Sequence, residues 1–290
     1  MTKLIAIDLD GTLLNSHNEI SAENLKAIKA AQKEGIEVVV ATGRAQFDVV
    51  EIFKNSGVKT WIIAANGATI HNPNGELFHS QPMEKETAGE ALQFLEENDY
   101  YYEVFGKDAI YTPQSGRELL SIEIDRVKSA NPKTDRAMLL QAAEKQYSQS
   151  GFEFVDSFTS ILDKTSDIYN ILAFSFHKEK LEAGWERFKD RENVTLVTSA
   201  AHNFELEHRL ASKGIALEKL SAHLGIDLKD TAAIGDSMND KSMLEIAGKS
   251  IAMGNARPEI KAICQDITLT NDQDGVELAI KRMLDALHHV

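Results

Sequence analysis

The chain has 290 residues, enough for one large hydrophobic core or two smaller ones, and 43% of them are apolar. Its formal net charge of −14 argues against nucleic acid and anionic membranes as partners. No stretch approaches the roughly 20 apolar residues of a membrane span. Residues 1–9 lack the basic start and the cleavage site of a signal peptide, so we expect a cytoplasmic protein.

The first predicted element is a strand at residues 4–7, a short β-branched run that is typical of a buried parallel strand. Asp8 and Asp10 follow it directly, and ligands of open α/β sheets bind at this end of the strands. Attack on a phosphomonoester needs a nucleophile, which Asp8 offers, and an acid for the leaving group, which Asp10 offers. For an isolated pair of this kind, polar loop residues around a turn at Gly11 would usually be the better interpretation, but the clusters that follow count against it.

A second polar cluster follows the next predicted strand. Ser21 caps a predicted helix that runs to Gly35, and an apolar strand at residues 37–41 leads into Thr42-Gly43-Arg44. The Thr42 hydroxyl and the Gly43 backbone N–H suit the binding of a phosphate near a helix N-terminus. A simple turn between strand and helix is the alternative.

Residues 61–65 form a third predicted strand, and the residue types of Asn66-Gly67 after it are typical of a turn. Residues 69–80 predict a hairpin around the turn at 72–75, which we expect to lead out of the core.

The pattern changes in residues 83–193, where we predict an inserted α+β unit. It consists of a helix at 84–97, aromatic strands at 100–105 and 109–112, two helices, and a strand at 169–176 before another helix. Five residues could line a substrate surface, although packing is the favoured role because strands prefer aromatic residues. These are Tyr100, Tyr101, Tyr102, Glu103 and Tyr111.

Strand and helix alternate again from residue 194. Ser212-Lys213-Gly214 opens a helical pattern, and a cation at that end makes sense if an anion binds there. The strand at 231–234 leads into residues 235–240, where Asp236 offers a hard oxygen ligand suited to Mg²⁺. Residues 1–82 and 194–290 therefore predict a doubly wound, Rossmann-like parallel sheet that brings these clusters to one edge.

The order of the four clusters resembles the four motifs of the haloacid dehalogenase superfamily of phosphohydrolases. The clusters are Asp8-Leu9-Asp10-Gly11-Thr12, Thr42-Gly43-Arg44, Ser212-Lys213-Gly214, and Gly235 to Asp240. The insertion at 83–193 resembles the large α/β (C2B-like) cap of the Cof-type branch, which closes over the phosphate and contacts the leaving group. One departure is Leu210-Ala211, where the branch often carries Gly-Val.

The resemblance implies roles for individual residues. Asp8 is the nucleophile and a metal ligand, Asp10 is the acid and base and binds metal through its backbone carbonyl, and Asp236 is a further metal ligand. Groups that hold phosphate are Leu9 N–H, the Thr42 hydroxyl, Gly43 N–H, the Lys213 amine and the Asn239 amide. Asp240 orients Lys213 or the acidic loop, Asn66 and Gly67 lie on the substrate side, and Arg44 matches the motif without an assigned role.

These residues predict a Mg²⁺-dependent phosphatase of small phosphorylated metabolites, with sugar phosphates favoured, that works through an aspartyl phosphate. A phosphomutase of similar architecture is one alternative, but it needs a cationic clamp, and Arg117, Arg126 and Arg136 are scattered in the sequence. A metabolite-sensing protein with little turnover is the other alternative. The sequence leaves the particular metabolite and the oligomeric state open.

Overall fold

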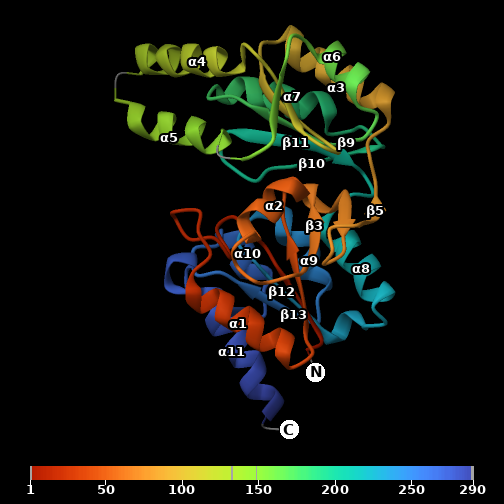
Figure 1. The fold of residues 1–290 in the computed structure, drawn as a ribbon. Helices are drawn as coiled ribbons and strands as arrows, with labels where there is room; N and C mark the ends of the chain where they lie inside the picture. Colours follow the sequence, from red (N-terminus) through yellow and green to blue (C-terminus); the bar gives the residue numbers. More distant parts are fainter. Residues whose placement is uncertain (1, 132, 148, 289–290) are drawn as a thin grey trace. The chain divides into compact units, whose positions relative to one another are not determined.

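A computed structural model describes residues 2–131, 133–147 and 149–288, and it is shown in Figure 1. The chain forms two compact units, one of Met1–Ser80 with Leu210–Val290 and one of Gln81–Arg209. Within the described residues, no helix is both long and apolar enough to cross a membrane.

The first unit is built on an eight-stranded sheet with the strand order β14-β13-β12-β1-β2-β3-β4-β5. The strands are β1 (Leu4–Ile7), β2 (Glu37–Ala41), β3 (Trp61–Ala64), β4 (Thr69–His71), β5 (Leu77–Ser80), β12 (Thr231–Gly235), β13 (Lys249–Ala252) and β14 (Asp266–Ile267). The six strands from β14 to β3 run parallel. Because β1 lies between β2 and β12, the strand order reverses there, which is where ligands bind in such sheets.

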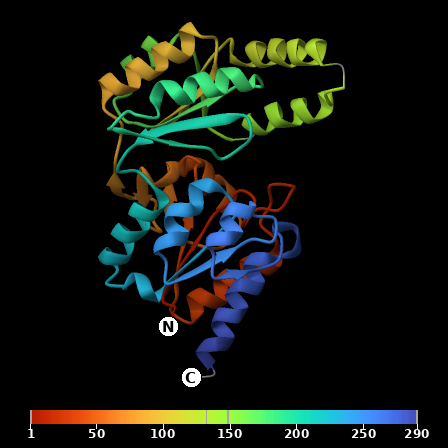
Figure 2. The same ribbon diagram turned by 180° about the vertical axis from the view of Figure 1, so that it is seen from behind.

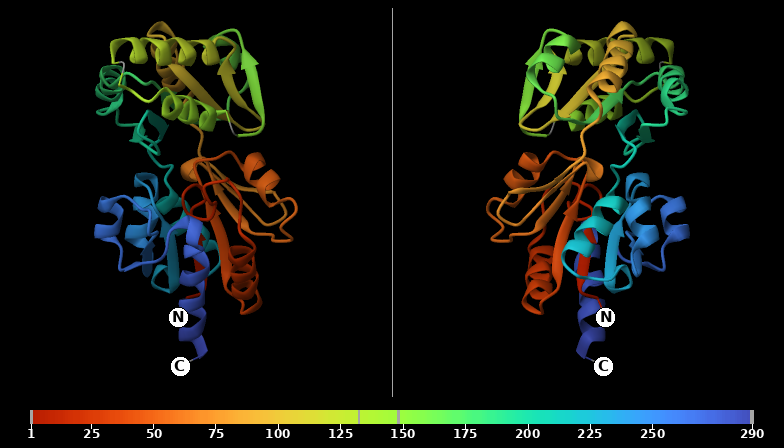
Figure 3. Two further views of the ribbon diagram at one scale, coloured as in Figure 1. Left: turned by 90° about the vertical axis from the view of Figure 1, so that its left-hand side faces the viewer. Right: turned by 90° about the vertical axis from the view of Figure 1, so that its right-hand side faces the viewer.

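Helices cover both faces of this sheet, as the doubly wound class requires (Figures 1, 2 and 3). α1 contacts α11 on one face, while α8 contacts α9 and α9 contacts α10 on the other. The helices of this unit are α1 (Ala22–Lys33), α2 (Gln46–Phe53), α8 (Lys213–His223), α9 (Lys241–Ile246), α10 (Pro258–Ile263) and α11 (Gly275–His288). The α/β fold class predicted from the sequence is therefore confirmed.

The hairpin of β4 and β5 leads out of the first unit, as predicted, because the inserted unit begins at Gln81, directly after β5. β4 pairs antiparallel with β3, with Ile70 opposite Ile63, and β5 extends the same sheet. Ile70 is fully buried in the core, so this hairpin belongs to the sheet.

The inserted unit carries a six-stranded sheet with the order β10-β11-β9-β6-β7-β8. Its strands are β6 (Tyr101–Gly106), β7 (Ile110–Pro113), β8 (Phe152–Val155), β9 (Ile168–Phe174), β10 (Val194–Val197) and β11 (Asn203–His208). Its helices are α3 (Lys85–Glu97), α4 (Gly116–Ala130), α5 (Arg136–Gln146), α6 (Phe158–Lys164) and α7 (Lys178–Phe188).

The inserted unit reaches Arg209, whereas the sequence placed its end at residue 193. The physical reason is strand pairing, because β11 pairs with β9 and β10 pairs with β11. Phe204 and Leu206 of β11 pack in the same apolar cluster as Tyr100 and Tyr102. Tyr111 belongs to this cluster as well, so these aromatic side chains have the packing role favoured from the sequence.

Two loops of the first unit meet at Gly67, which ends the short 3-10 helix η1 (Ala65–Gly67). Its φ of +103° is unfavourable for residues with a side chain, and a Cβ here would lie 2.2 Å from the Ser212 carbonyl oxygen. Ser212 caps α8 by accepting a hydrogen bond from the Ile215 N–H. Glycine at position 67 therefore allows the loop after β3 to approach the start of α8.

We expect Gly67→Ala to lower the free energy of unfolding by about 3 kcal/mol, because backbone strain and a steric clash add together. Gly35→Ala is the matched control, since Gly35 has a φ of +77° but no described atom within 4 Å of such a Cβ. Its cost should be about 1 kcal/mol, from strain alone. Urea unfolding measures both variants, and equal losses would contradict the steric account.

Candidate active site

The Lys213 ammonium group links the first and third sequence clusters. Its Nζ donates hydrogen bonds of 2.6 Å to Asp8 Oδ1 and of 2.6 Å to Asp240 Oδ1. All three residues are buried, with Lys213 and Asp240 fully inaccessible to solvent. Asp8 lies at the end of β1, Lys213 lies in the first turn of α8, and Asp240 lies in the loop after β12. The sheet edge thus brings together residues that are far apart in the sequence.

Asp240 also fixes the acidic loop after β12. Its Oδ2 accepts hydrogen bonds of 2.9 Å from the backbone N–H groups of Asp236 and Ser237. A Cβ at Gly235 would lie 2.6 Å from the Asp240 carboxyl carbon, so glycine is required for this close approach. The Asp236 carboxylate in turn accepts from the Thr12 hydroxyl at 3.1 Å and from the Ser237 hydroxyl at 3.0 Å.

The carboxylates outnumber the cations at this edge. Burial raises the pKa of Asp8 well above its usual range, and the charge of Asp240 adds to this effect while Lys213 opposes it. Burial and the charge of Asp240 likewise raise the pKa of Asp236 to about 6. Burial alone would lower the pKa of Lys213, but the charges of Asp240 and Asp8 outweigh it, and the pKa is raised. An additional cation would relieve this repulsion.

Asp8, Asp236 and Asp240 each offer a carboxylate oxygen within 4.8 Å of the others, the one group of this kind among the described residues. Asp240 is fully inaccessible and accepts from the Lys213 ammonium and from two backbone N–H groups, whereas Asp236 is partly exposed and accepts, within the described chain, only from two hydroxyl groups. Asp8 and Asp236 are thus the better placed ligands, and their hard oxygens suit Mg²⁺.

Arg44, which the sequence left without a role, holds the Asp10 side chain. Its Nε and Nη2 donate to the two Asp10 oxygens at 2.7 Å each, and its Nη1 donates to Asp48 Oδ2 at 2.7 Å. Burial opposes the charge of Arg44, yet the hydrogen bonds and charges of Asp10 and Asp48 raise its pKa. A bidentate pair of this kind fixes the orientation of both groups.

Asp48 was missed in the sequence analysis. It is buried in the first turn of α2 and lies four residues after Arg44. An Arg and an Asp at this spacing near a helix start are a pair that the sequence could have indicated.

The remaining predicted residues lie around the same edge. Thr42 is buried, and its hydroxyl accepts a hydrogen bond of 3.1 Å from the backbone N–H of Arg44, two residues before α2 begins at Gln46. Leu9 is fully buried between the two aspartates of the first cluster. A Cβ at Gly43 would lie 3.0 Å from Asn66 Oδ1, so Gly43 leaves room for that side chain.

Asn66 is buried in the left-handed region with φ +50° and ψ +27°, which asparagine tolerates better than most residues. Its Oδ1 accepts a hydrogen bond of 3.0 Å from Asn239 Nδ2. Together with Gly67, this contact joins the second, third and fourth clusters through the loop after β3.

The chain is similar to known hydrolases and phosphatases over nearly its whole length. Residues 5–280 match the family of haloacid dehalogenase-like hydrolases. The chain is 59% identical to phosphatase YwpJ of Bacillus subtilis over 97% of this chain and 100% of that protein. It is 40% identical to the B. subtilis 5-amino-6-(5-phospho-D-ribitylamino)uracil phosphatase YwtE over 97% of this chain and 98% of the relative.

A solved structure of a haloacid dehalogenase-like hydrolase from B. subtilis superimposes with a TM-score of 0.86 at 59% identity, covering 97% of this chain and 99% of the other. The chain therefore belongs to the haloacid dehalogenase-like hydrolases, in the Cof-type branch predicted from the four clusters. Within that family it is a phosphoric monoester hydrolase, a phosphatase.

We expect Lys213→Gln to lower the free energy of unfolding at pH 7 by roughly 3 kcal/mol or more, because two buried carboxylates lose their shared cation. Lys241→Gln on α9 is the control. Lys241 is half exposed and makes only a surface pair with Glu245, so its loss should cost less than about 0.5 kcal/mol. Urea unfolding compares the two, and similar losses would show that the buried ion pair does not stabilise the fold.

Proposed function

We propose that the protein is a cytoplasmic, Mg²⁺-dependent phosphatase that hydrolyses small phosphorylated metabolites, with sugar phosphates favoured, through an aspartyl phosphate on Asp8. The observation that carries this proposal is the buried Asp8 carboxylate, fixed by Lys213 at 2.6 Å at the point where the strand order reverses. A carboxylate fixed in this way is oriented for attack, because only one of its oxygens is taken by this bond.

In the first half of the reaction, an Asp8 oxygen attacks the phosphorus atom and the bond from phosphorus to the leaving oxygen breaks. Asp10 gives a proton to that oxygen, so the product leaves as an alcohol. Lys213 remains beside the phosphoryl group, where its charge offsets part of the negative charge that spreads over the transferring oxygens. The Thr42 hydroxyl, the Leu9 and Gly43 N–H groups and the Asn239 amide are the proposed phosphate donors.

In the second half, water attacks the phosphorus atom and the bond between phosphorus and the Asp8 oxygen breaks. Asp10 takes the proton from this water, inorganic phosphate leaves, and the Asp8 carboxylate is restored. The structure holds Asp10 with both oxygens accepting from Arg44, which is the carboxylate form that this step requires. Arg44 and Asp48 thus support the role of Asp10 as the base.

The acidic group fits a divalent cation, and we assign Asp8 and Asp236 as its side-chain ligands, with the Asp10 backbone carbonyl as a third. Bound Mg²⁺ would supply positive charge that offsets the negative charge of the phosphate and of the carboxylates. The raised pKa values of Asp8 and Asp236 support the proposal, because they reflect burial and the repulsion of Asp240, and a bound cation would favour the charged form of both carboxyl groups.

We assign the choice of substrate to the inserted unit, Gln81–Arg209, as the cap. The names of the relatives support a small phosphorylated metabolite. One is a 5-amino-6-(5-phospho-D-ribitylamino)uracil phosphatase, and an HMP-PP phosphatase of Yersinia pseudotuberculosis is 28% identical over 99% of this chain and 97% of that protein.

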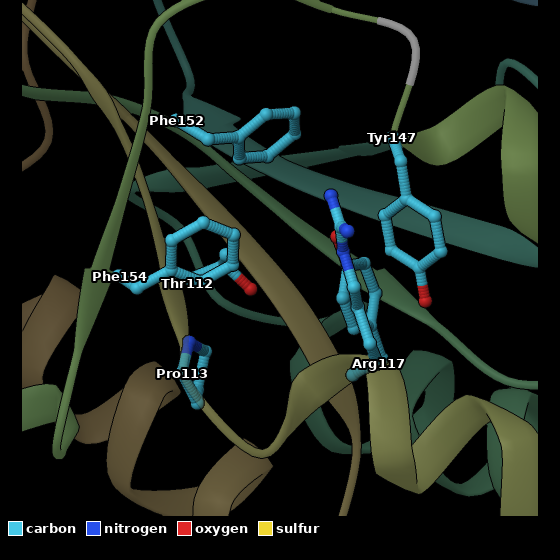
Figure 4. Close-up of a pocket in the computed structure, with 7 residues that line it drawn as sticks. Thr112, Pro113, Arg117, Tyr147, Phe152 and Phe154 are labelled. Atoms are coloured by element: carbon cyan, nitrogen blue, oxygen red, sulfur yellow. The ribbon is translucent and has the colours of Figure 1, made fainter.

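The phosphomutase alternative needs a cationic clamp for a second phosphate. Two of the arginines considered for this clamp contact other side chains of the protein. The Arg117 guanidinium lies 4.5 Å from the centre of the Tyr147 ring, in a pocket walled by Phe152 and Phe154 (Figure 4). Arg136 pairs with Asp125 at 3.3 Å. A sensor without turnover has no need for both a nucleophile and an acid, so we favour the phosphatase over both alternatives.

The test is phosphate release from sugar phosphates and p-nitrophenyl phosphate, with Mg²⁺ or EDTA. We expect Mg²⁺-dependent release that falls by roughly a thousandfold or more in Asp8→Asn, because the nucleophile is lost. The control is Asp227→Asn, an exposed aspartate of the same unit, which should keep full activity. Full activity in Asp8→Asn would remove the nucleophile assignment, and release that is unaffected by EDTA would remove the metal.

A further inference from the structure

The loop that follows β13 contacts both of the loops that carry Asp10 and Asp236. The Asn255 side chain donates from Nδ2 to the Gly11 carbonyl oxygen at 2.7 Å. The Arg257 backbone N–H donates to the Asp236 carbonyl oxygen at 3.1 Å. Because Gly11 follows Asp10 directly, the segment at 254–257 joins two loops that supply proposed metal ligands.

Gly11 lies against the Asp236 carboxylate. It has a φ of +78°, and a Cβ at this position would lie 2.7 Å from Asp236 Oδ2. Glycine leaves room for this contact, but it is also the residue with the greatest backbone freedom. The Asp10 carbonyl belongs to the planar peptide unit that precedes the Gly11 Cα, so its direction depends on the backbone at Gly11. This part of the loop therefore needs a restraint that glycine itself does not provide.

The Asn255 side chain provides such a restraint. Within the described residues, its Nδ2 is the one donor to the Gly11 carbonyl oxygen. Its Oδ1 accepts a hydrogen bond of 3.0 Å from the Asn271 backbone N–H, so the amide group is held at both ends. Asn255 is exposed, and a hydrogen bond in contact with solvent adds little to the stability of a fold. Restraint of Gly11 is thus the role that this arrangement favours.

Asn271 is the first residue of the 3-10 helix η4 (Asn271–Gln273), and it holds the same loop further along the chain. Its Nδ2 donates to the Leu14 carbonyl oxygen at 2.9 Å. Asp272 Oδ1 accepts from the Ser16 backbone N–H at 2.7 Å. Shortening Asn255 would release the Gly11 carbonyl but would remove neither of these bonds. Asn271 therefore offers a matched control, because its side chain makes the same kind of bond three residues away from Gly11.

We propose that Asn255 is a positioning residue of the metal site, which acts by fixing the backbone at Gly11 and thereby the direction of the Asp10 carbonyl relative to Asp236. This inference rests on the proposed function, because it takes the Asp10 carbonyl and Asp236 as ligands of Mg²⁺. Residues that orient a ligand without touching the metal change metal affinity by about 10- to 100-fold when they are replaced.

The experiment is thermal unfolding of the full chain in EDTA and in a series of Mg²⁺ concentrations, for the wild type, Asn255→Ala and Asn271→Ala. The melting temperature in EDTA reports the effect of each substitution on the fold alone. The rise of the melting temperature with Mg²⁺ gives the dissociation constant of Mg²⁺, because a ligand that binds the folded state stabilises it.

We expect the two variants to melt at similar temperatures in EDTA, since each loses a hydrogen bond from an asparagine side chain to a backbone carbonyl of the same loop. The dissociation constant of Mg²⁺ should rise about tenfold in Asn255→Ala and change by less than about twofold in Asn271→Ala. The Mg²⁺ concentration for half-maximal phosphate release should rise with it in Asn255→Ala.

Two results would overturn the inference alone, because Mg²⁺ would still stabilise the wild type. They are an unchanged Mg²⁺ dissociation constant in Asn255→Ala and equal increases in both variants. A wild type that Mg²⁺ does not stabilise would remove the metal from the proposed function, and this inference with it. If Asn255→Ala folds poorly, Asn255→Ser takes its place, since its hydroxyl is one bond closer to the backbone than the Asn255 Nδ2, and the same outcomes decide.

Discussion

The buried ammonium group of Lys213 is the interaction on which the first unit depends. It donates at 2.6 Å to Asp8 and at 2.6 Å to Asp240, and it thereby ties the end of β1 to the start of α8 and to the loop after β12. In the sequence, β1 comes before the inserted unit, whereas α8 and the loop after β12 come after it. Removing the cation would leave buried carboxylates without a partner, so the same bond that orients the proposed nucleophile also stabilises the core.

One lysine does not balance the charge of the three carboxylates around it. This charge imbalance favours the binding of a further cation. The pKa values of Asp8 and Asp236 are raised because burial and neighbouring charge both disfavour ionisation. A binding site for a cation is the function that benefits from such repulsion. Both Asp10 oxygens accept from Arg44, whereas Asp8 accepts from Lys213, so the two aspartates of the first cluster have different surroundings.

The site could be predicted from the sequence where a chemically reactive residue directly adjoins a recognisable strand or helix. This is true of the carboxylates after the strand at 4–7, of Lys213 at a helix start, and of Asp236 after a strand. The predicted boundary at residue 193 differs from the structure, because the pairing of β11 with β9 depends on contacts that no local window contains. Asp48 is different, because its partner Arg44 lies only four residues before it and this spacing could have indicated the pair.

The central claim is that Asp8 carries the phosphoryl group, and covalent trapping tests it most directly. The Asp10→Asn variant, mixed with p-nitrophenyl phosphate and quenched in acid, should accumulate a phosphorylated protein, because a good leaving group needs no acid while hydrolysis of the intermediate needs the base. Peptide mass spectrometry should place the phosphate on Asp8, and Asp8→Asn should show none. Sustained turnover by the wild-type enzyme with no covalent phosphate in Asp10→Asn, or phosphate on another residue, would contradict the account.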